Sequence, residues 1–275
     1  MVGFPYAFAM RKIFLLLGLV SLSVIAAPVR SNLGGDGVGY IEDAVVDYTA
    51  ADYVQDGLYG LWDGLENAGF GIHDAGLRKI VDLSGNGHDI SMPTSWILGD
   101  DYINSKTKAV KETFTSEDLD NIYADGLTVE MVVIILSEDK MELFCWSPYG
   151  GISFHYNSSY TPIGHIMFDI SVSGDGGSSY IYPHFAMDIP SRHTITFTMK
   201  VGGPSYLYLD GKVADYNSTF GKMRRDYSGL HCFAGWGNDN KAPDNLFHCA
   251  RFYTRALTAE EVKYNAVVDK VRFGL

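Results

Sequence analysis

Five stretches of the chain combine β-branched and aromatic residues, and several of them alternate apolar with polar positions. They are Leu127–Ile135, Ile163–Val172, Ser179–Met187, His193–Val201 and Ser205–Tyr216. Such residues favour the pleated, half-buried surface of a β-strand. Because turn residues rather than helices separate the stretches, the pattern indicates an all-β sandwich or jelly roll of antiparallel sheets, and not alternating α/β units.

Two local motifs sharpen this expectation. Asp210 and Gly211 lie in the middle of the last stretch, and this pair tolerates the positive φ angles of a type I′ turn, which predicts a tight hairpin. Near the end of the chain, Thr258 and Glu261 form a capping box. A stripe at helical spacing follows, and we expect it to dock a C-terminal helix on the sandwich. Its members are Tyr264, Val267, Val268 and Val271.

The N-terminal residues read as a targeting segment. Arg11 and Lys12 precede an apolar run that ends in two small residues, which is typical of a secretory signal peptide over residues 1–27. A membrane anchor is the alternative, but the run is short for a span. Residues 28–52 are glycine-rich and predict a flexible lead-in, and residues 53–275 predict one domain. We expect the protein to be secreted, periplasmic or on the cell surface.

The net charge limits the classes of ligand that we expect, and the number of cysteines limits the role of disulfides. The formal net charge is −12, so the chain repels phosphate backbones and nucleic acid is not expected as a partner, whereas cations and neutral ligands such as sugars are favoured. Three cysteines do not build a disulfide framework. Cys232 and Cys249 lie in two apolar segments that could pair as neighbouring strands, so a bridge and two buried thiols both stay open.

Catalytic motifs are scarce. The sequence has no His-Glu-x-x-His pair, no Gly-x-Ser-x-Gly elbow and no Walker loop. A glycoside hydrolase needs two carboxylates across the scissile bond. Glu130 has no second carboxylate two residues away, and we interpret it as a strand residue that faces solvent or forms a polar pair. An enzyme is therefore the least favoured class.

Binding chemistry is better supplied. Tryptophan and tyrosine offer flat faces on which sugar rings stack, and neighbouring Asn and Asp side chains bind hydroxyls. Two loop-like stretches combine both kinds of residue, although core packing is the common alternative for any single tryptophan. The residues expected to bind carbohydrate are Trp236, Asn238, Asp239, Asn240, Trp146 and Tyr149.

A polar stretch, "VDLSGNGHDI", allows a cation site. Calcium takes several oxygen ligands, and Asp82, Asn86 and Asp89 could supply them. The alternative is that these side chains bind their own backbone in a tight strand connection.

Two longer segments carry a family resemblance. Residues Asp52–Ile90, "DYVQDGLYGLWDGLENAGFGIHDAGLRKIVDLSGNGHDI", resemble the opening of concanavalin A-like, LamG-type jelly-roll domains of exported Bacteroidetes proteins. Residues His248–Leu275 resemble their closing strand and helix, with Thr254 where the family usually has Asn. The resemblance implies two stacked antiparallel sheets and roles in glycan binding or adhesion, with calcium bound in some relatives.

Together these features predict an exported, non-enzymatic protein that binds carbohydrate or another extracellular surface ligand. The alternatives are a structural or protein-interaction component of a cell-surface assembly and, less favoured, a glycoside hydrolase.

Overall fold

The structure is a computed structural model of the chain. It describes residues 47–68, 73–74, 76–104, 110–113, 116–137, 141–146, 152–158, 160–174, 177–181, 183–218, 222–223, 229–232 and 245–275. One compact unit spans Asp47–Leu275. Its first element is a short 3-10 helix, η1 (Ala50–Asp52), in which Ala50 is buried against the rest of the unit.

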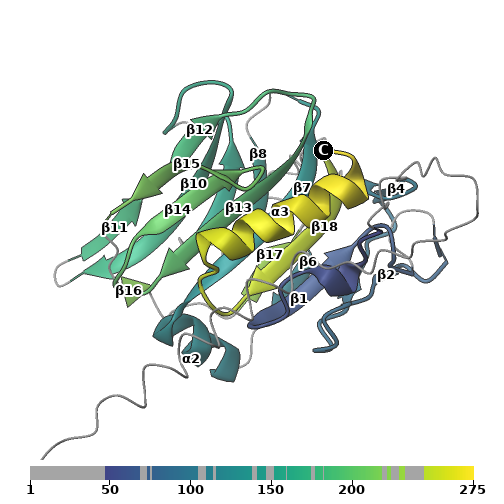
Figure 1. The fold of residues 1–275 in the computed structure, drawn as a ribbon, viewed down its shortest axis with the longest axis horizontal. Coiled ribbons are helices and arrows are strands. Elements are labelled where there is room, and N and C mark those ends of the chain that lie inside the picture. Colours follow the sequence, from purple (N-terminus) through teal and green to yellow (C-terminus); the bar gives the residue numbers. More distant parts are fainter. Residues whose placement is uncertain are drawn as a thin grey trace, which may run out of the picture. The chain divides into compact units, whose positions relative to one another are not determined.

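Two antiparallel sheets make up the unit (Figure 1). The first sheet has the order β15 (Lys212–Asn217), β14 (Ser205–Leu209), β13 (Arg192–Lys200), β7 (Gly126–Ile135), β18 (Asn245–Tyr253), β5 (Ile103–Asn104) and β4 (Ile97–Leu98), and β1 (Leu58–Asp63) also pairs with β18. The second sheet has the order β11 (Gly177–Ile181), β10 (His165–Gly174), β9 (Ile152–Tyr156), β8 (Met141–Trp146), β17 (Gly229–Cys232) and β6 (Val110–Thr113), with β12 (His184–Ala186) and β16 (Lys222–Met223) on β10. A small pair, β2 (Lys79–Ile80) and β3 (Ile90–Ser91), and a helix, α2 (Ser116–Ala124), complete the described elements outside the C-terminus.

The main core lies between the inner faces of the two sheets. Alternate residues of β7, such as Val129 and Met131, point into it, as do Phe197 of β13 and Phe168 of β10. The rings of Phe168 and Phe197 stack across the interface with centroids 3.4 Å apart. This alternation is what a strand with one face on a sandwich core requires.

The outer face of the first sheet is covered by the C-terminal helix α3 (Ala259–Phe273), which crosses β13, β7 and β18 in Figure 1. The predicted capping box is confirmed, since the Thr258 hydroxyl accepts the Glu261 N–H and the Glu261 carboxylate accepts the Thr258 N–H. Among the described residues no helix is long and apolar enough to cross a membrane.

The predicted apolar stripe of α3 is wrong in part. Val267 and Val271 are exposed, whereas Asn265 and Asp269 are fully buried. The physical reason is that the sheet beneath α3 presents charged side chains, so the helix turns polar residues inward to pair with them. Val262 and Val268 supply the apolar contacts of a second cluster between helix and sheet.

Most predicted strands are confirmed, with shifted ends. Leu127–Ile135 and His193–Val201 lie in β7 and β13, and the Asp210–Gly211 turn has φ angles of 50° and 75° between β14 and β15, as a type I′ turn requires. The stretch Ser179–Met187 is not one strand, because β11 ends at Ile181 and β12 begins at His184.

Candidate functional site

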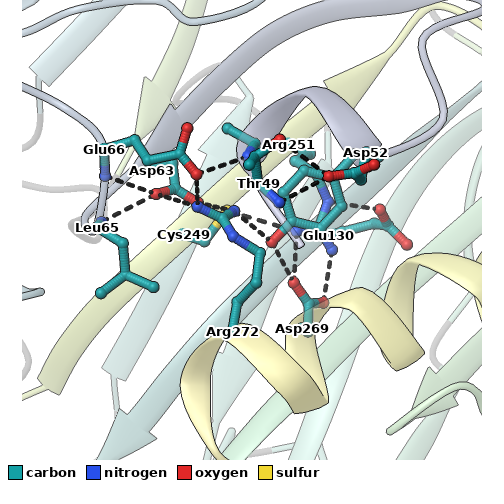
Figure 2. Close-up of polar contacts among 12 residues, drawn as sticks. Thr49, Asp52, Asp63, Leu65, Glu66, Glu130, Cys249, Arg251, Asp269 and Arg272 are labelled. Carbon is teal, nitrogen blue, oxygen red and sulfur yellow. Dashed lines mark hydrogen bonds and ion pairs between the residues drawn. The ribbon is translucent and has the colours of Figure 1, made fainter. Parts of the chain in front are cut away.

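A cluster of charged side chains lies between α3 and the first sheet (Figure 2). Arg251 of β18 donates through Nε to Oε2 of Glu130 on β7 at 2.8 Å. Its two terminal nitrogens each donate to one carboxylate oxygen of Asp269 on α3, both at 2.7 Å. One guanidinium therefore joins two neighbouring strands to the helix. We call Glu130, Arg251, Asn265 and Asp269 the Arg251 cluster.

Neutral donors complete the hydrogen bonding of the carboxylate oxygens: one binds Glu130 Oε1, and three are second donors to oxygens that already accept from Arg251. They are the Asn265 amide and the Thr196 hydroxyl on Glu130, and the Thr194 and Tyr53 hydroxyls on Asp269, at 2.7, 3.1, 2.9 and 2.8 Å respectively. A buried charge is tolerated only when it is paired and hydrogen-bonded in this way.

A second ion pair extends the cluster toward β1. Arg272 donates to Asp63 at 2.5 Å and to Glu66 at 2.6 Å. The ring of Tyr53 lies beside both guanidinium groups. Its centroid is 4.0 Å from Cζ of Arg251 and 5.3 Å from Cζ of Arg272. The last turn of α3 is therefore fastened to the start of the domain.

The burial of the Arg251 cluster indicates that it holds α3 on the sheet and is not a catalytic pair of carboxylates. Burial raises the pKa of Glu130 above its ordinary value, against the lowering effect of Arg251. The side chains of Glu130 and Asp269 are both 0% exposed, so a glycosidic bond cannot reach them. Of the two interpretations of Glu130, the polar pair is correct and the solvent-facing position is wrong.

The loop that was a candidate for calcium is held by its own hydrogen bonds. Asp82 is buried, and its Oδ1 accepts the main-chain N–H groups of Leu61 and Ser84, both at 2.9 Å. Its Oδ2 accepts the Ser84 hydroxyl at 2.7 Å and the His88 N–H at 3.1 Å. These contacts join the loop to β1 and shape its turn.

The other two candidate ligands act in the same turn. The Asn86 amide donates to the main-chain oxygens of Leu58 and Tyr59 at 2.8 and 3.0 Å. Asp89 accepts the Asp82 N–H at 2.8 Å and pairs with Lys79. Within the described ranges, no three His, Cys, Asp or Glu side chains gather as a metal site would require. The hydrogen bonds of Asp82, Asn86 and Asp89 are those of a tight turn, and calcium binding by these residues stays a prediction.

Most residues predicted to bind sugar lie outside the described residues. This holds for Trp236, Asn238, Asp239, Asn240 and Tyr149, and for the side chain of Trp146, whose backbone ends β8. The other two tryptophans, Trp62 and Trp96, are buried in the main core, which is the ordinary packing role.

Of the two alternatives left open for Cys232 and Cys249, the bridge does not form. Cys249 is a buried free thiol on β18 of the first sheet, whereas Cys232 ends β17 of the second sheet. The two strands belong to different layers, so they do not pair as neighbours.

An exposed aromatic surface, which the sequence analysis did not single out, lies on the β14–β15 hairpin. Leu207 points into the main core, so its neighbour Tyr206 must point to the opposite face. Tyr216 of β15 is directly across from Tyr206 in the register, with ring centroids 6.1 Å apart and planes inclined by 26°. Val213 lies on the same strand. Tyr216 is 60% exposed and Val213 52%. We call Tyr206, Val213 and Tyr216 the tyrosine edge.

The tyrosine edge rests on a rigid support. Tyr206 packs against the second cluster under α3. A Cβ on Gly211 in the turn would come within 2.8 Å of the Ala266 side chain, so the hairpin touches α3 directly. The alternation of Tyr206 and Tyr208 around Leu207 was the signal in the sequence, but Tyr216 could be placed opposite Tyr206 only once the bulge between Leu207 and Tyr208 was known.

Comparisons with known proteins concern the fold. No protein-family model matches the chain, and no curated protein sequence matches it. Solved structures do. The binding domain of Paraclostridial mosquitocidal protein 1 is similar with a TM-score of 0.57 and 15% identity over 77% of this chain and 52% of that one.

Two botulinum neurotoxin structures are similar as well. The serotype D ligand-binding domain in complex with N-acetylneuraminic acid has a TM-score of 0.56 and 12% identity over 78% of this chain and 51% of that one. The serotype DC binding domain in complex with rat synaptotagmin II has a TM-score of 0.52 and 13% identity over 79% and 52%. The chain spans about half the length of these structures. It is an all-β sandwich of two antiparallel sheets with a C-terminal helix, in a jelly-roll-like arrangement that these binding domains share.

Proposed function

We propose that this chain is an exported, non-enzymatic carbohydrate-binding or adhesion protein, and that the tyrosine edge forms part of its binding surface. The observation that carries the proposal is the pair of tyrosines, Tyr206 and Tyr216, held side by side on the two strands of the β14–β15 hairpin. Tyrosine rings present flat apolar faces to a sugar ring, while their hydroxyl groups bind water or ligand oxygens.

Three further features support this proposal. Tyr206 is anchored on the second cluster, so little side-chain freedom is lost when a ligand binds. The net charge of −12 favours neutral or cationic ligands over anionic ones. The similar structures are binding domains, and one of them was solved with a monosaccharide.

The finer assignments belong to the same proposal. The motifs at Asp52–Ile90 and His248–Leu275 support membership of the concanavalin A-like, LamG-type domains of exported Bacteroidetes proteins. Residues 1–27 would be the signal peptide, which would place the protein outside the cell, in the periplasm or on the cell surface. N-terminal sequencing of the exported protein tests this, and a start at Met1 or Met10 would contradict it.

A glycan array probed with the protein, with and without calcium, tests the binding function. We expect Tyr216→Ala to weaken binding about two- to ten-fold, the loss of one aromatic contact of about 0.5–1.5 kcal/mol. Tyr160→Ala is the matched control, because Tyr160 is 71% exposed but lies between β9 and β10, outside the β14–β15 hairpin. Trp236→Ala tests the predicted sugar-binding loop in the same assay.

The outcomes separate the alternatives. Undiminished binding by folded Tyr216→Ala would remove the tyrosine edge from the site. Binding only with calcium would support a cation in the Asp82–Asp89 loop. No glycan binding under either condition would favour a protein ligand instead. β15, the terminal strand of the first sheet in the described order, is where such a ligand could add a strand.

A further inference from the structure

Two histidines of the second sheet lie against each other. His165 is the first residue of β10 and His184 is the first residue of β12, and these strands pair antiparallel. Their Nδ1 atoms are 2.9 Å apart, and their ring centroids are 5.0 Å apart at an interplanar angle of 56°. Both side chains are half-buried. The two nitrogens therefore face each other from two strands at hydrogen-bonding distance.

The backbone on both sides of this point is fixed. The His184 N–H donates to Oδ2 of Asp215 on β15 at 2.8 Å, a contact between the two sheets. The main-chain oxygen of His165 accepts the Asn157 N–H at 3.0 Å. The two backbone segments that carry the rings are thus held by contacts of the fold itself.

The separation of the two Nδ1 atoms also fits a metal chelate. Imidazole nitrogen lies about 2.0–2.1 Å from a first-row metal ion. Two such ligands at a right angle are about 2.9 Å apart, whereas a tetrahedral angle would separate them by about 3.3 Å. The observed 2.9 Å matches the right angle. Square-planar or tetragonal coordination by nitrogen and oxygen is typical of Cu²⁺ and Ni²⁺.

We propose that His165 and His184 form a two-histidine site for a tetragonal divalent transition metal, Cu²⁺ or Ni²⁺. The metal binds the lone pairs of both Nδ1 atoms and replaces the hydrogen bond between them; the ring that held its hydrogen on Nδ1 carries it on Nε2 instead, so both imidazoles are neutral. In the described part of the chain no group of three ligating side chains gathers, so water or a second molecule supplies the other positions.

The charge around the pair favours a cation. The Asp215 carboxylate binds the main chain of one of the two histidines, and the whole chain carries a net charge of −12. A negative carboxylate and a negative surface both raise the local concentration of cations. Asp215 is a positioning residue in this proposal, because its contact is with backbone rather than with the metal.

Titration of the full chain with CuCl₂, followed by electron paramagnetic resonance, tests the site. We expect the first equivalent of Cu²⁺ to give an axial spectrum with coupling to two imidazole nitrogens. His165→Gln and His184→Gln should each remove that two-nitrogen signature and weaken binding about ten-fold or more. His193→Gln is the matched control, since His193 pairs with Asp210 at the start of β13.

A measurement on the unmodified chain makes the test independent of variant folding. Substoichiometric Cu²⁺ should broaden the nuclear magnetic resonance signals of the His165 and His184 rings before those of His193. The proposal is overturned if either glutamine variant keeps the two-nitrogen spectrum, if His193→Gln loses it, or if other histidine rings broaden first.

Discussion

Asp269 should be the most sensitive charged residue of α3. Its two carboxylate oxygens accept four hydrogen bonds, two from Arg251 and one each from Tyr53 and Thr194. Asp269→Asn keeps the size of the side chain but removes its charge and turns one acceptor into a donor. Breaking one side of a buried ion pair costs about 3–5 kcal/mol of unfolding free energy. For a domain of this size that corresponds to a melting temperature lower by about 6–20 °C.

Urea and thermal unfolding followed by circular dichroism measure this loss. Glu260→Gln is the matched control, because Glu260 is an exposed carboxylate in the first turn of the same helix. Its loss should cost less than about 1 kcal/mol, the value of a charge near a helix N-terminus. Equal stabilities of the two variants would refute the assignment of the Arg251 cluster as the clamp of α3.

A double-mutant cycle separates the pair from its surroundings. Arg251→Met should cost less in the Asp269→Asn background than in the wild-type chain, since one charge has already lost its partner. Residues in direct contact show coupling energies of about 0.5–3 kcal/mol. Additive costs would mean that the two side chains stabilise the domain independently, despite the 2.7 Å contacts between them.

Three further predictions concern single positions. Hydrogen bonding to Asp210 raises the pKa of His193 above 6.5. Protonated His193 therefore stabilises the fold at a pH below the pKa that His193 has in the unfolded chain, and this stabilisation is lost as the pH rises through the pKa of the folded state. The stability difference between wild type and His193→Gln should therefore be larger at about pH 5.5 than at about pH 8.5, and a difference that grows with pH would contradict this. Thr258→Ala removes the cap of α3 and should lower the urea-unfolding free energy by about 0.5–2 kcal/mol; an unchanged midpoint would show that the cap is dispensable. Gly126→Ala places a Cβ 1.9 Å from a main-chain oxygen of β13 at a φ of +135° and should cost more than about 1 kcal/mol. Gly85→Ala also meets a positive φ, +82°, but has open space around it, so it should cost less than Gly126→Ala; the reverse order in thermal unfolding would contradict this geometry.

Local sequence patterns predicted the elements whose stabilising contacts are local. The Asp210–Gly211 turn and the Thr258 cap depend on residues within a few positions of each other, and both form as expected. Alternation located β7 and β13 because alternate residues of both strands, such as Val129 and Phe197, lie in the apolar main core. It failed at Ser179–Met187, where β11 and β12 are separate strands that pair with different parts of β10.

Features that depend on distant partners could not be predicted in this way. Glu130 has no charged neighbour along its strand, and its partner Arg251 is 121 positions away. The same pairing turned Asp269 inward and left Val267 and Val271 exposed on α3. The tyrosine edge and the pair of histidines on the second sheet arise from strand register, which the sequence analysis did not assign.

The first and last strands of the unit pair with each other, and this order determines when the first sheet can form. β1 is the first strand of the unit, yet it pairs with β18, and Tyr53 binds Asp269 across 216 positions. β18 also lies between β1 and β7 in the first sheet. Until residues 245–275 have emerged from the ribosome, the centre of this sheet is missing and its polar outer face is uncovered. Such long-range pairing slows folding, so the first sheet cannot be completed on the ribosome before residues 245–275 have emerged.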